Sequence, residues 1–208
     1  QFAADAVVCS VPLGVLKRQR IDFAPRLEPA RRAAIDRLGF GCLERILLVY
    51  DTPFWPVEHD FVGFVEWGGP VAHFANLTKL DPSAPAALVG FASGPRAAEL
   101  AALGEAGLVD AAIAPLEAQF GDVAARPIHA TATRWSADPG FGGAYSYLRV
   151  GATFDDIDCL ARSAGDALHF AGEATCRQFP GTTHGAFYSG LRAAEDVARA
   201  VWRSIDAA

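Results

Sequence analysis

Hydrophobic residues occur along this chain both in short runs and in helical repeats. Runs of mostly apolar residues bounded by turn residues predict strands at 44–50, 61–67, 71–77, 87–93 and 127–135. A Gly-Gly-Pro tripeptide between the second and third of these predicts a hairpin. Shorter apolar runs predict buried strands at 6–9 and 168–171. Apolar residues three or four positions apart predict helices at 28–38, 105–120, 154–162 and 182–205.

Proline and glycine mark the two ends of one of these helices, and a proline interrupts another. Pro29 lies near the first position of the 28–38 helix and Gly39 follows its last, which is the arrangement that helices prefer. Pro115 lies inside the 105–120 segment, and we expect it either to kink that helix or to shift its start.

The order of the elements predicts a fold that combines α/β and α+β parts. The two ends look like pieces of one α/β domain, and the middle looks like an α+β domain inserted into it, with a mostly antiparallel sheet. We therefore predict that residues 1–16 supply a strand of the first domain. Residues 17–150 form the inserted domain, and residues 151–208 return to the first domain with a strand and a helix.

The second half of the last predicted helix has the pattern of a packing element. Its polar face carries Arg192 with Asp196 and Glu195 with Arg199, each pair four positions apart. Its other face carries a continuous apolar stripe of Phe187, Leu191, Ala194, Val197, Ala198, Val201 and Ile205. We expect this stripe to face the core.

The first turn of the same helix has a different character. Thr182 or Thr183 can cap it, and small residues such as Ala186 leave its N–H groups and the positive end of its dipole uncovered. Gly172 ends the preceding strand, and Glu173 follows as an acceptor at the carboxyl end of a strand, where α/β proteins bind ligands. The residues alone fit a cofactor site and an ordinary capped helix after a loop about equally well.

Composition narrows the class of protein. Of 208 residues, 51% are hydrophobic, and the net charge of −6 argues against nucleic acid as the main partner. No apolar run approaches the roughly 20 residues of a membrane span. The four cysteines form no C-x-x-C pair, and the histidines are scattered, so we expect no metal site and a reduced cytoplasmic protein.

Five segments, in a fixed order over nearly the whole chain, carry a specific combination of residues. They are ADAVVCSVPLGVLK from residue 4, IDRLGFG from 35, PFW from 53, WSADP leading to YSY at 135–147, and FAGEAT, PGTTHGA and SGLRAAE within 170–195. This combination resembles the flavin-containing amine oxidases, which include monoamine oxidases, polyamine oxidases and lysine-specific histone demethylases. The resemblance implies that both chain ends belong to a Rossmann-like FAD-binding domain and that the middle forms a substrate domain covered by helices.

The resemblance implies cofactor contacts at several positions of the 170–195 segment. Gly172 and Glu173 match the turn that lies on FAD, close to its ribityl and pyrophosphate groups. Thr182 and Thr183 match the helix start that approaches the pyrimidine end of the flavin, and Ala186 closes this part of the cradle. A backbone N–H at Thr183 is expected to bond a flavin carbonyl or to stabilise negative charge on the reduced ring.

Further positions imply how the flavin and an amine would be held. Trp135 matches a tryptophan that packs against the flavin, although an interior aromatic is the simpler reading of that residue alone. Tyr145 matches an aromatic that lines the amine site, and Thr182 replaces the second tyrosine of monoamine oxidases, which implies a wider site. Ala144 lies where monoamine oxidases carry the flavin-linked cysteine, so FAD is expected to be non-covalent.

Arg45 departs from the family pattern. It occupies the position of a lysine that holds a water near flavin N5, and arginine cannot serve as a base at ordinary pH. It can still hold a water, unless the pairing slips by a residue or the side chain faces solvent. The predicted catalytic positions are therefore Arg45, Tyr145 and Thr182, and the predicted cofactor contacts are Trp135, Gly172, Glu173, Thr182, Thr183 and Ala186.

The expected function is that of the C-terminal part of an FAD-dependent amine oxidase. Such an enzyme oxidises a small amine to an imine by hydride transfer to flavin and releases hydrogen peroxide. No G-x-G-x-x-G fingerprint opens a helix, so we expect the FAD-binding N-terminal half to be missing and the chain alone to bind FAD weakly or not at all. The alternatives are a non-catalytic subunit that needs a separate FAD-binding chain, and a flavoprotein oxidase acting on amino acids or non-amine substrates. Exposed apolar surface at the docking face predicts self-association into a homo-oligomer.

Overall fold

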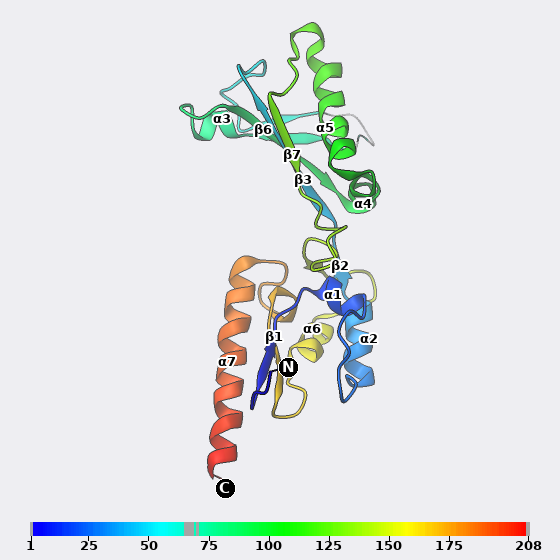
Figure 1. Cartoon of the computed structure of the whole chain (residues 1–208), viewed down its shortest axis with the longest axis vertical. Helices are drawn as coiled ribbons and strands as arrows, with labels where there is room; N and C mark the ends of the chain where they lie inside the picture. Colours follow the sequence, from blue (N-terminus) through cyan, green and yellow to red (C-terminus); the bar gives the residue numbers. More distant parts are fainter. Residues whose placement is uncertain (1, 65–68, 70, 207–208) are drawn as a thin grey trace. The chain divides into compact units, whose positions relative to one another are not determined.

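The chain folds into two compact units. The computed structural model describes residues 2–64, 69 and 71–206. One unit combines residues 1–41 with 139–208, and the other consists of residues 42–138 (Figure 1). The middle unit contains fewer residues than the predicted 17–150 segment, because residues 17–41 and 139–150 pack with the two chain ends.

The unit that holds both chain ends is built on two pairs of short strands. β1 and β9 run parallel, with Val7 opposite Leu168 and Cys9 opposite Phe170, while β2 and β8 pair antiparallel. Helix α7 lies alongside β9, and α2 packs on α6 (Figure 1). The elements are β1 (Val7–Cys9), α1 (Leu13–Lys17), α2 (Pro29–Arg37), β2 (Gly39–Phe40), β8 (Ser146–Tyr147), α6 (Phe154–Ala161), β9 (Leu168–Phe170), the 3-10 turn η2 (Glu173–Thr175) and α7 (Thr183–Asp206).

The core of this unit lies among α1, α2 and α6 and reaches η2. Its buried apolar side chains are Leu13, Leu16, Ile35, Leu38, Ile157, Leu160 and Ala174. A capping box formed by Thr153 and Asp156 fixes the start of α6. Arg37 donates two hydrogen bonds to Asp156 Oδ1, from Nε at 2.9 Å and from Nη2 at 2.5 Å, and so joins α2 to α6.

The middle unit is a five-stranded antiparallel sheet in the order β4-β5-β6-β3-β7. Helices α4 and α5 contact β3, and β3 turns Glu44, Ile46, Leu48 and Tyr50 toward its buried face. The elements are β3 (Leu43–Tyr50), β4 (Phe61–Gly63), β5 (His73–Asn76), α3 (Leu77–Leu80), β6 (Ala86–Ser93), α4 (Gly94–Ala102), α5 (Gly104–Phe120), the 3-10 turn η1 (Gly121–Val123) and β7 (His129–Ala132).

The mixed fold class is confirmed, as are the predicted helices and strands, with shifted ends. Helices α1, α3 and α4 were not predicted, and α5 starts at Gly104, so Pro115 does not shift its start. β4 pairs with β5 as the predicted hairpin requires, but its Gly-Gly-Pro turn lies largely outside the described residues. β1 forms as predicted but is not buried, since Val7 and Val8 are exposed by 53% and 43%.

Helix α7 packs with a different face from the one that its apolar stripe predicts. Phe187 and Leu191, both in the stripe, are exposed by 65% and 49%. Among the described side chains of α7, the buried positions are instead the small residues Gly185, Ser189, Ala193 and Ala200. Small side chains let the helix backbone approach the unit closely, so α7 lies against β9 and η2 with its larger apolar residues turned outward.

Candidate functional site

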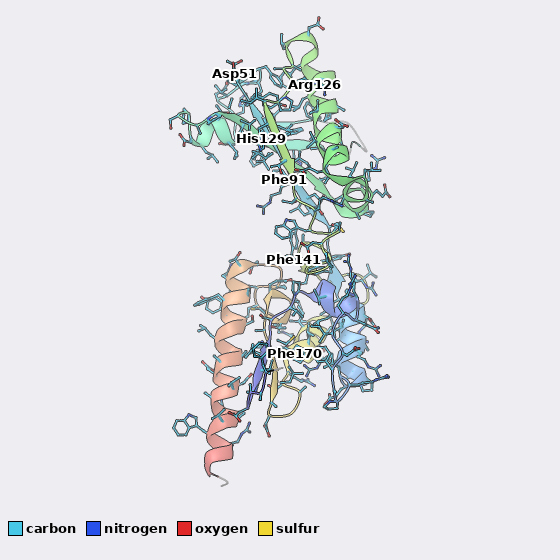
Figure 2. All side chains as sticks on the ribbon, in the orientation of Figure 1. Asp51, Phe91, Arg126, His129, Phe141 and Phe170 are labelled. Atoms are coloured by element: carbon cyan, nitrogen blue, oxygen red, sulfur yellow. The ribbon has the colours of Figure 1, made fainter. Side chains whose placement is uncertain are left out.

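A hollow of about 250 Å³ lies at the carboxyl ends of the parallel strands β1 and β9. The loop after β1 supplies Ser10, Val11 and Pro12, and the turn after β9 supplies residues 171–175. Ala186, in the first turn of α7, closes another part of the wall. The aromatic residues Phe141 and Phe170, labelled in Figure 2, also line it, together with Cys9, Leu13, Leu16, Phe40, Ala144 and Leu160. Small and apolar side chains therefore make up most of this wall.

Gly172 adopts a backbone conformation that only glycine takes easily. Its φ is +109°, while an added Cβ would meet only Ser10 O at 3.8 Å, so conformation rather than space requires glycine here. Its N–H donates to Ser189 Oγ at 2.8 Å, and its carbonyl accepts from Thr175 Oγ1 at 2.8 Å. Ser189 Oγ donates in turn to the Ala186 carbonyl at 2.6 Å, so α7 fixes the turn that lines the hollow.

Glu173 uses its carboxylate inside the protein. Oε1 accepts a hydrogen bond from Ser146 N at 3.0 Å, and Oε2 accepts from Ser146 Oγ at 2.5 Å and from Gly181 N at 2.7 Å. The residues next to these donors are Tyr145 and Thr182. The carboxylate therefore joins β8 to the loop before α7, and it brings two predicted substrate-site residues to one end of the unit.

The start of α7 is capped as the sequence predicts, and Thr182 is the cap. Its hydroxyl accepts a hydrogen bond from Gly185 N at 3.0 Å and donates to the Phe179 carbonyl at 2.8 Å. Ala186 N donates to the Thr182 carbonyl at 3.0 Å. Among the described residues, the N–H groups of Thr183 and His184 have no acceptor. The first turn of α7 therefore keeps donors available to an anion or a carbonyl.

Tyr145 directly precedes strand β8 of the same unit. Its carbonyl accepts a hydrogen bond from Gly41 N at 2.7 Å, and its side chain is 45% exposed. A Cβ added at Gly181 would lie 3.5 Å from Tyr145 Cδ2, so the ring borders the loop before α7. The structure thus collects Tyr145, Gly172, Glu173, Thr182, Thr183 and Ala186 in one unit.

Arg45 and Trp135 belong to the other unit. Arg45 lies on β3 opposite Phe91 of β6 with its side chain exposed, on the face that α4 and α5 do not cover. Trp135 follows β7 and is 38% exposed. The hydroxyl of Thr133 accepts a hydrogen bond from Arg45 N at 2.9 Å, so β3 and the segment after β7 are directly connected.

The sequence analysis did not predict the polar side chains that hold the segments around the hollow together. Arg192 donates to the carbonyls of Ala161 and Phe170, each at 2.7 Å, and to Thr175 Oγ1 at 3.0 Å. Burial lowers the pKa of its guanidinium, although the sequence placed it in a surface pair with Asp196. The predicted pair of Glu195 and Arg199 does form, at 2.9 Å.

Sequence signals for the supporting residues exist but are weak. Gly185, Ser189 and Ala193 recur every four positions and mark the face of α7 that packs closely. A glutamate alternating with Ile46 and Leu48 in β3 marks Glu44 as a buried carboxylate.

The part of the chain that is described holds neither a candidate metal site nor a candidate membrane span. No group of three or more His, Cys, Asp or Glu side chains there could hold a metal ion. No described helix is long and apolar enough to cross a membrane. The four cysteines are unpaired, and burial raises the pKa of the Cys9 thiol, which lines the hollow.

The sequence matches one protein family and is similar to those of named proteins. The family described as Flavin containing amine oxidoreductase matches residues 1–198. Lysine-specific histone demethylase 1 homolog 2 of Arabidopsis thaliana is 39% identical over 204 residues, covering 94% of this chain and 27% of that protein. Lysine-specific histone demethylase 1 homolog 1 of Oryza sativa subsp. japonica is 38% identical over 207 residues, covering 97% of this chain and 24% of that protein.

Solved structures agree at the level of the fold. Cyclohexylamine oxidase from Brevibacterium oxydans IH-35A superposes with a TM-score of 0.76 at 24% identity, covering 94% of this chain and 43% of that one. Wild-type putrescine oxidase bound to putrescine superposes with a TM-score of 0.76 at 22% identity and the same coverage. The chain spans roughly a quarter of the length of the two curated relatives and less than half of these structures. On the match over residues 1–198, the chain belongs to the flavin-containing amine oxidoreductase family.

Proposed function

We propose that residues 1–208 form part of an FAD-dependent amine oxidase and that the hollow at the ends of β1 and β9 holds the flavin end of FAD. The carrying observation is that Gly172 and Ala186 both line that hollow, and that Ala186 belongs to the first turn of α7, which Thr182 caps. Membership of a flavin-containing family supports the same assignment.

The residues of the hollow fit such a group. Its wall is largely apolar, which suits a flat ring system, and the Gly172 turn leaves room for close approach. The N–H of Thr183 offers a donor for a ring carbonyl. Ala144 also lines the wall and has no thiol to attach to the ring, so the FAD would be held without a covalent bond. Glu173 would act by holding the loop rather than by bonding FAD with its carboxylate.

Bound FAD would supply the acceptor for a hydride from the carbon next to the amine, and oxygen would then regenerate it with release of peroxide. The chain's own residues bind and orient. The exposed ring of Tyr145 offers an electron-rich face to an amine. Thr182 contributes a small side chain whose hydroxyl already caps α7, so it limits the site by shape. Arg45 would keep its charge and hold a water, without accepting a proton.

A second candidate substrate is a methylated lysine side chain. The curated relatives that match at 35–39% identity over most of this chain include several named as lysine-specific histone demethylases. A threonine at position 182 instead of a second aromatic would admit a bulkier amine. Oxidation of an N-methyl group would give an imine that hydrolyses to formaldehyde and the amine.

The proposal extends to partners and location. A small or side-chain amine is the expected substrate, and neither nucleic acid nor a membrane is required as a partner. The four unpaired cysteines support a reducing compartment such as the cytoplasm. Contact with a further FAD-binding part of the same protein and self-association through exposed apolar residues such as Phe187 are part of the proposal, while a separate FAD-binding chain remains the alternative.

Anaerobic reduction tests the function. The natural protein in its full length is purified, and the visible absorbance of oxidised flavin is followed while amines are added. Spermine, tyramine, L-amino acids and a peptide with dimethyl-lysine form the panel. We expect bleaching by at least one amine, with formaldehyde released only if the peptide is the substrate. Bleaching by L-amino acids alone would favour the amino acid oxidase alternative, and a protein without flavin would contradict the proposal.

A further inference from the structure

Glu44 is a buried carboxylate to which neither the family resemblance nor the proposed function gives a role. Its side chain lies on the covered face of β3, in line with Ile46 and Leu48, and is fully excluded from solvent at 0% exposure. A carboxylate in such a place is stable only if its oxygens accept hydrogen bonds. Its partners therefore indicate what it does.

All three donors to this carboxylate come from the segment that follows β7. Thr133 Oγ1 donates to Oε2 at 2.8 Å, Trp135 N donates to Oε2 at 3.0 Å, and Ser136 N donates to Oε1 at 2.9 Å. The sequence predicts a strand as far as residue 135, but β7 ends at Ala132. After Ala132 the chain leaves the sheet, and its next residues donate to the Glu44 carboxylate in place of hydrogen bonds to a neighbouring strand.

The same segment is also bonded to Arg45. Arg45 N donates to Thr133 Oγ1 at 2.9 Å, and Thr133 N donates to the Arg45 carbonyl at 2.9 Å. The Thr133 hydroxyl thus accepts from Arg45 and donates to Glu44. One connected network fixes the backbone at Arg45 and at Trp135, while the Arg45 side chain stays exposed on the opposite face of β3.

We infer that Glu44 is a positioning residue that holds Trp135 and Arg45 in a fixed mutual arrangement. The meaning of this for catalysis rests on the proposed function, in which Arg45 holds a water. Glutamine cannot replace Glu44, because three donors converge on two oxygens and an amide group would turn its own N–H₂ toward a backbone N–H. The inference thus predicts a local effect from a nearly isosteric change.

Fluorine NMR of the whole chain labelled with fluorotryptophan tests this directly. The Trp135 signal is assigned from its loss in Trp135→Phe, and the Trp55 and Trp202 signals report on the rest of the two units. Glu44→Gln is expected to displace or broaden the Trp135 signal by more than its line width and to leave the Trp55 and Trp202 signals in place. The fourth tryptophan, Trp67, lies outside the described residues and is not used as a reporter. Glu99→Gln, which changes an exposed glutamate of the same unit, is expected to move none of them. An unmoved Trp135 signal in Glu44→Gln would overturn the inference.

If Glu44→Gln unfolds the middle unit, the Trp55 signal is lost as well. Two variants of Thr133 then test whether Glu44 positions Trp135. Thr133→Val removes the hydroxyl and keeps the carboxylate, and we expect it to displace the Trp135 signal, whereas Thr133→Ser restores the original position. A Trp135 signal unmoved by Thr133→Val would also overturn the role of Glu44. These readouts need no flavin, so failure of amines to reduce the full-length protein would count against the proposed function alone.

Discussion

Replacing Glu173 with glutamine should loosen the loop before α7 without unfolding its unit. The carboxylate accepts from Ser146 N at 3.0 Å, Ser146 Oγ at 2.5 Å and Gly181 N at 2.7 Å. A glutamine side chain keeps one acceptor oxygen, so whichever way the amide turns, one of the two backbone N–H groups faces an N–H₂ group. Hydrogen bonds to a charged acceptor contribute about 1.5–3 kcal/mol, and an unsatisfied buried donor costs about 1–3 kcal/mol. A local loss of about 2–3 kcal/mol is expected.

Amide hydrogen exchange measures this loss at the residues concerned. Because about 1.4 kcal/mol corresponds to a factor of ten, exchange at Gly181 or Ser146 should accelerate by roughly 30- to 140-fold. The control is Glu195→Gln, which removes an exposed carboxylate paired with Arg199 and should leave these amides unchanged. Equal exchange rates at Gly181 and Ser146 in Glu173→Gln and in the unaltered chain would refute the role given to this carboxylate.

Four further substitutions probe the same unit by unfolding experiments. Gly185→Ala should lower the melting temperature, because an added Cβ would collide with a carbonyl oxygen of the preceding loop. Gly190→Ala has open space around the added Cβ and should stabilise α7 by about 0.5–1 kcal/mol. A higher melting temperature in both variants would contradict the packing at Gly185. Arg192→Leu leaves three oxygen acceptors without their donor, and we expect it to lower the free energy of unfolding measured in urea by about 2–4 kcal/mol. A decrease below about 0.5 kcal/mol would show that these hydrogen bonds do not stabilise the unit. The hydrogen bond from Arg37 holds the pKa of Asp156 below its usual value of about 3.9. The stabilisation by Asp156 is therefore complete above that value and lost as the pH falls through the lower folded pKa. The stability gap between the unaltered chain and Asp156→Asn should be constant above about pH 5 and shrink below about pH 4, and a gap independent of pH would be the contrary result.

The sequence predicted positions near the hollow better than it predicted what their side chains do. The Gly172 turn and the capped helix start follow from local rules, since a positive φ and an N-cap need particular residue types within a few positions. Glu173 and Arg192 could not be assigned in this way. Their partners lie 8 to 31 residues away and come together only through the pairing of β8 and the packing of α6.

Helix α7 shows how periodicity alone misleads. The pattern carries two stripes at helical spacing, one of large apolar residues that includes Leu191 and one of small residues that includes Ser189. The usual rule assigns the large stripe to the core. In this unit the small stripe is buried, because close approach lets Ser189 bond the Gly172 turn, and Leu191 stays 49% exposed.

Flavin content of two glycine variants tests the central claim most directly. Gly172 and Gly165 both have positive φ, at +109° and +66°, and neither has an atom closer than 3.8 Å to an added Cβ. Alanine therefore strains both backbones without a collision, and the strain is larger at Gly172, whose ψ of 161° belongs to a region essentially restricted to glycine. Only Gly172 lines the hollow. In the natural full-length protein, Gly172→Ala is predicted to lower the flavin-to-protein ratio several-fold and Gly165→Ala to leave it unchanged. Equal flavin content in both variants would contradict the assignment of this hollow to the flavin.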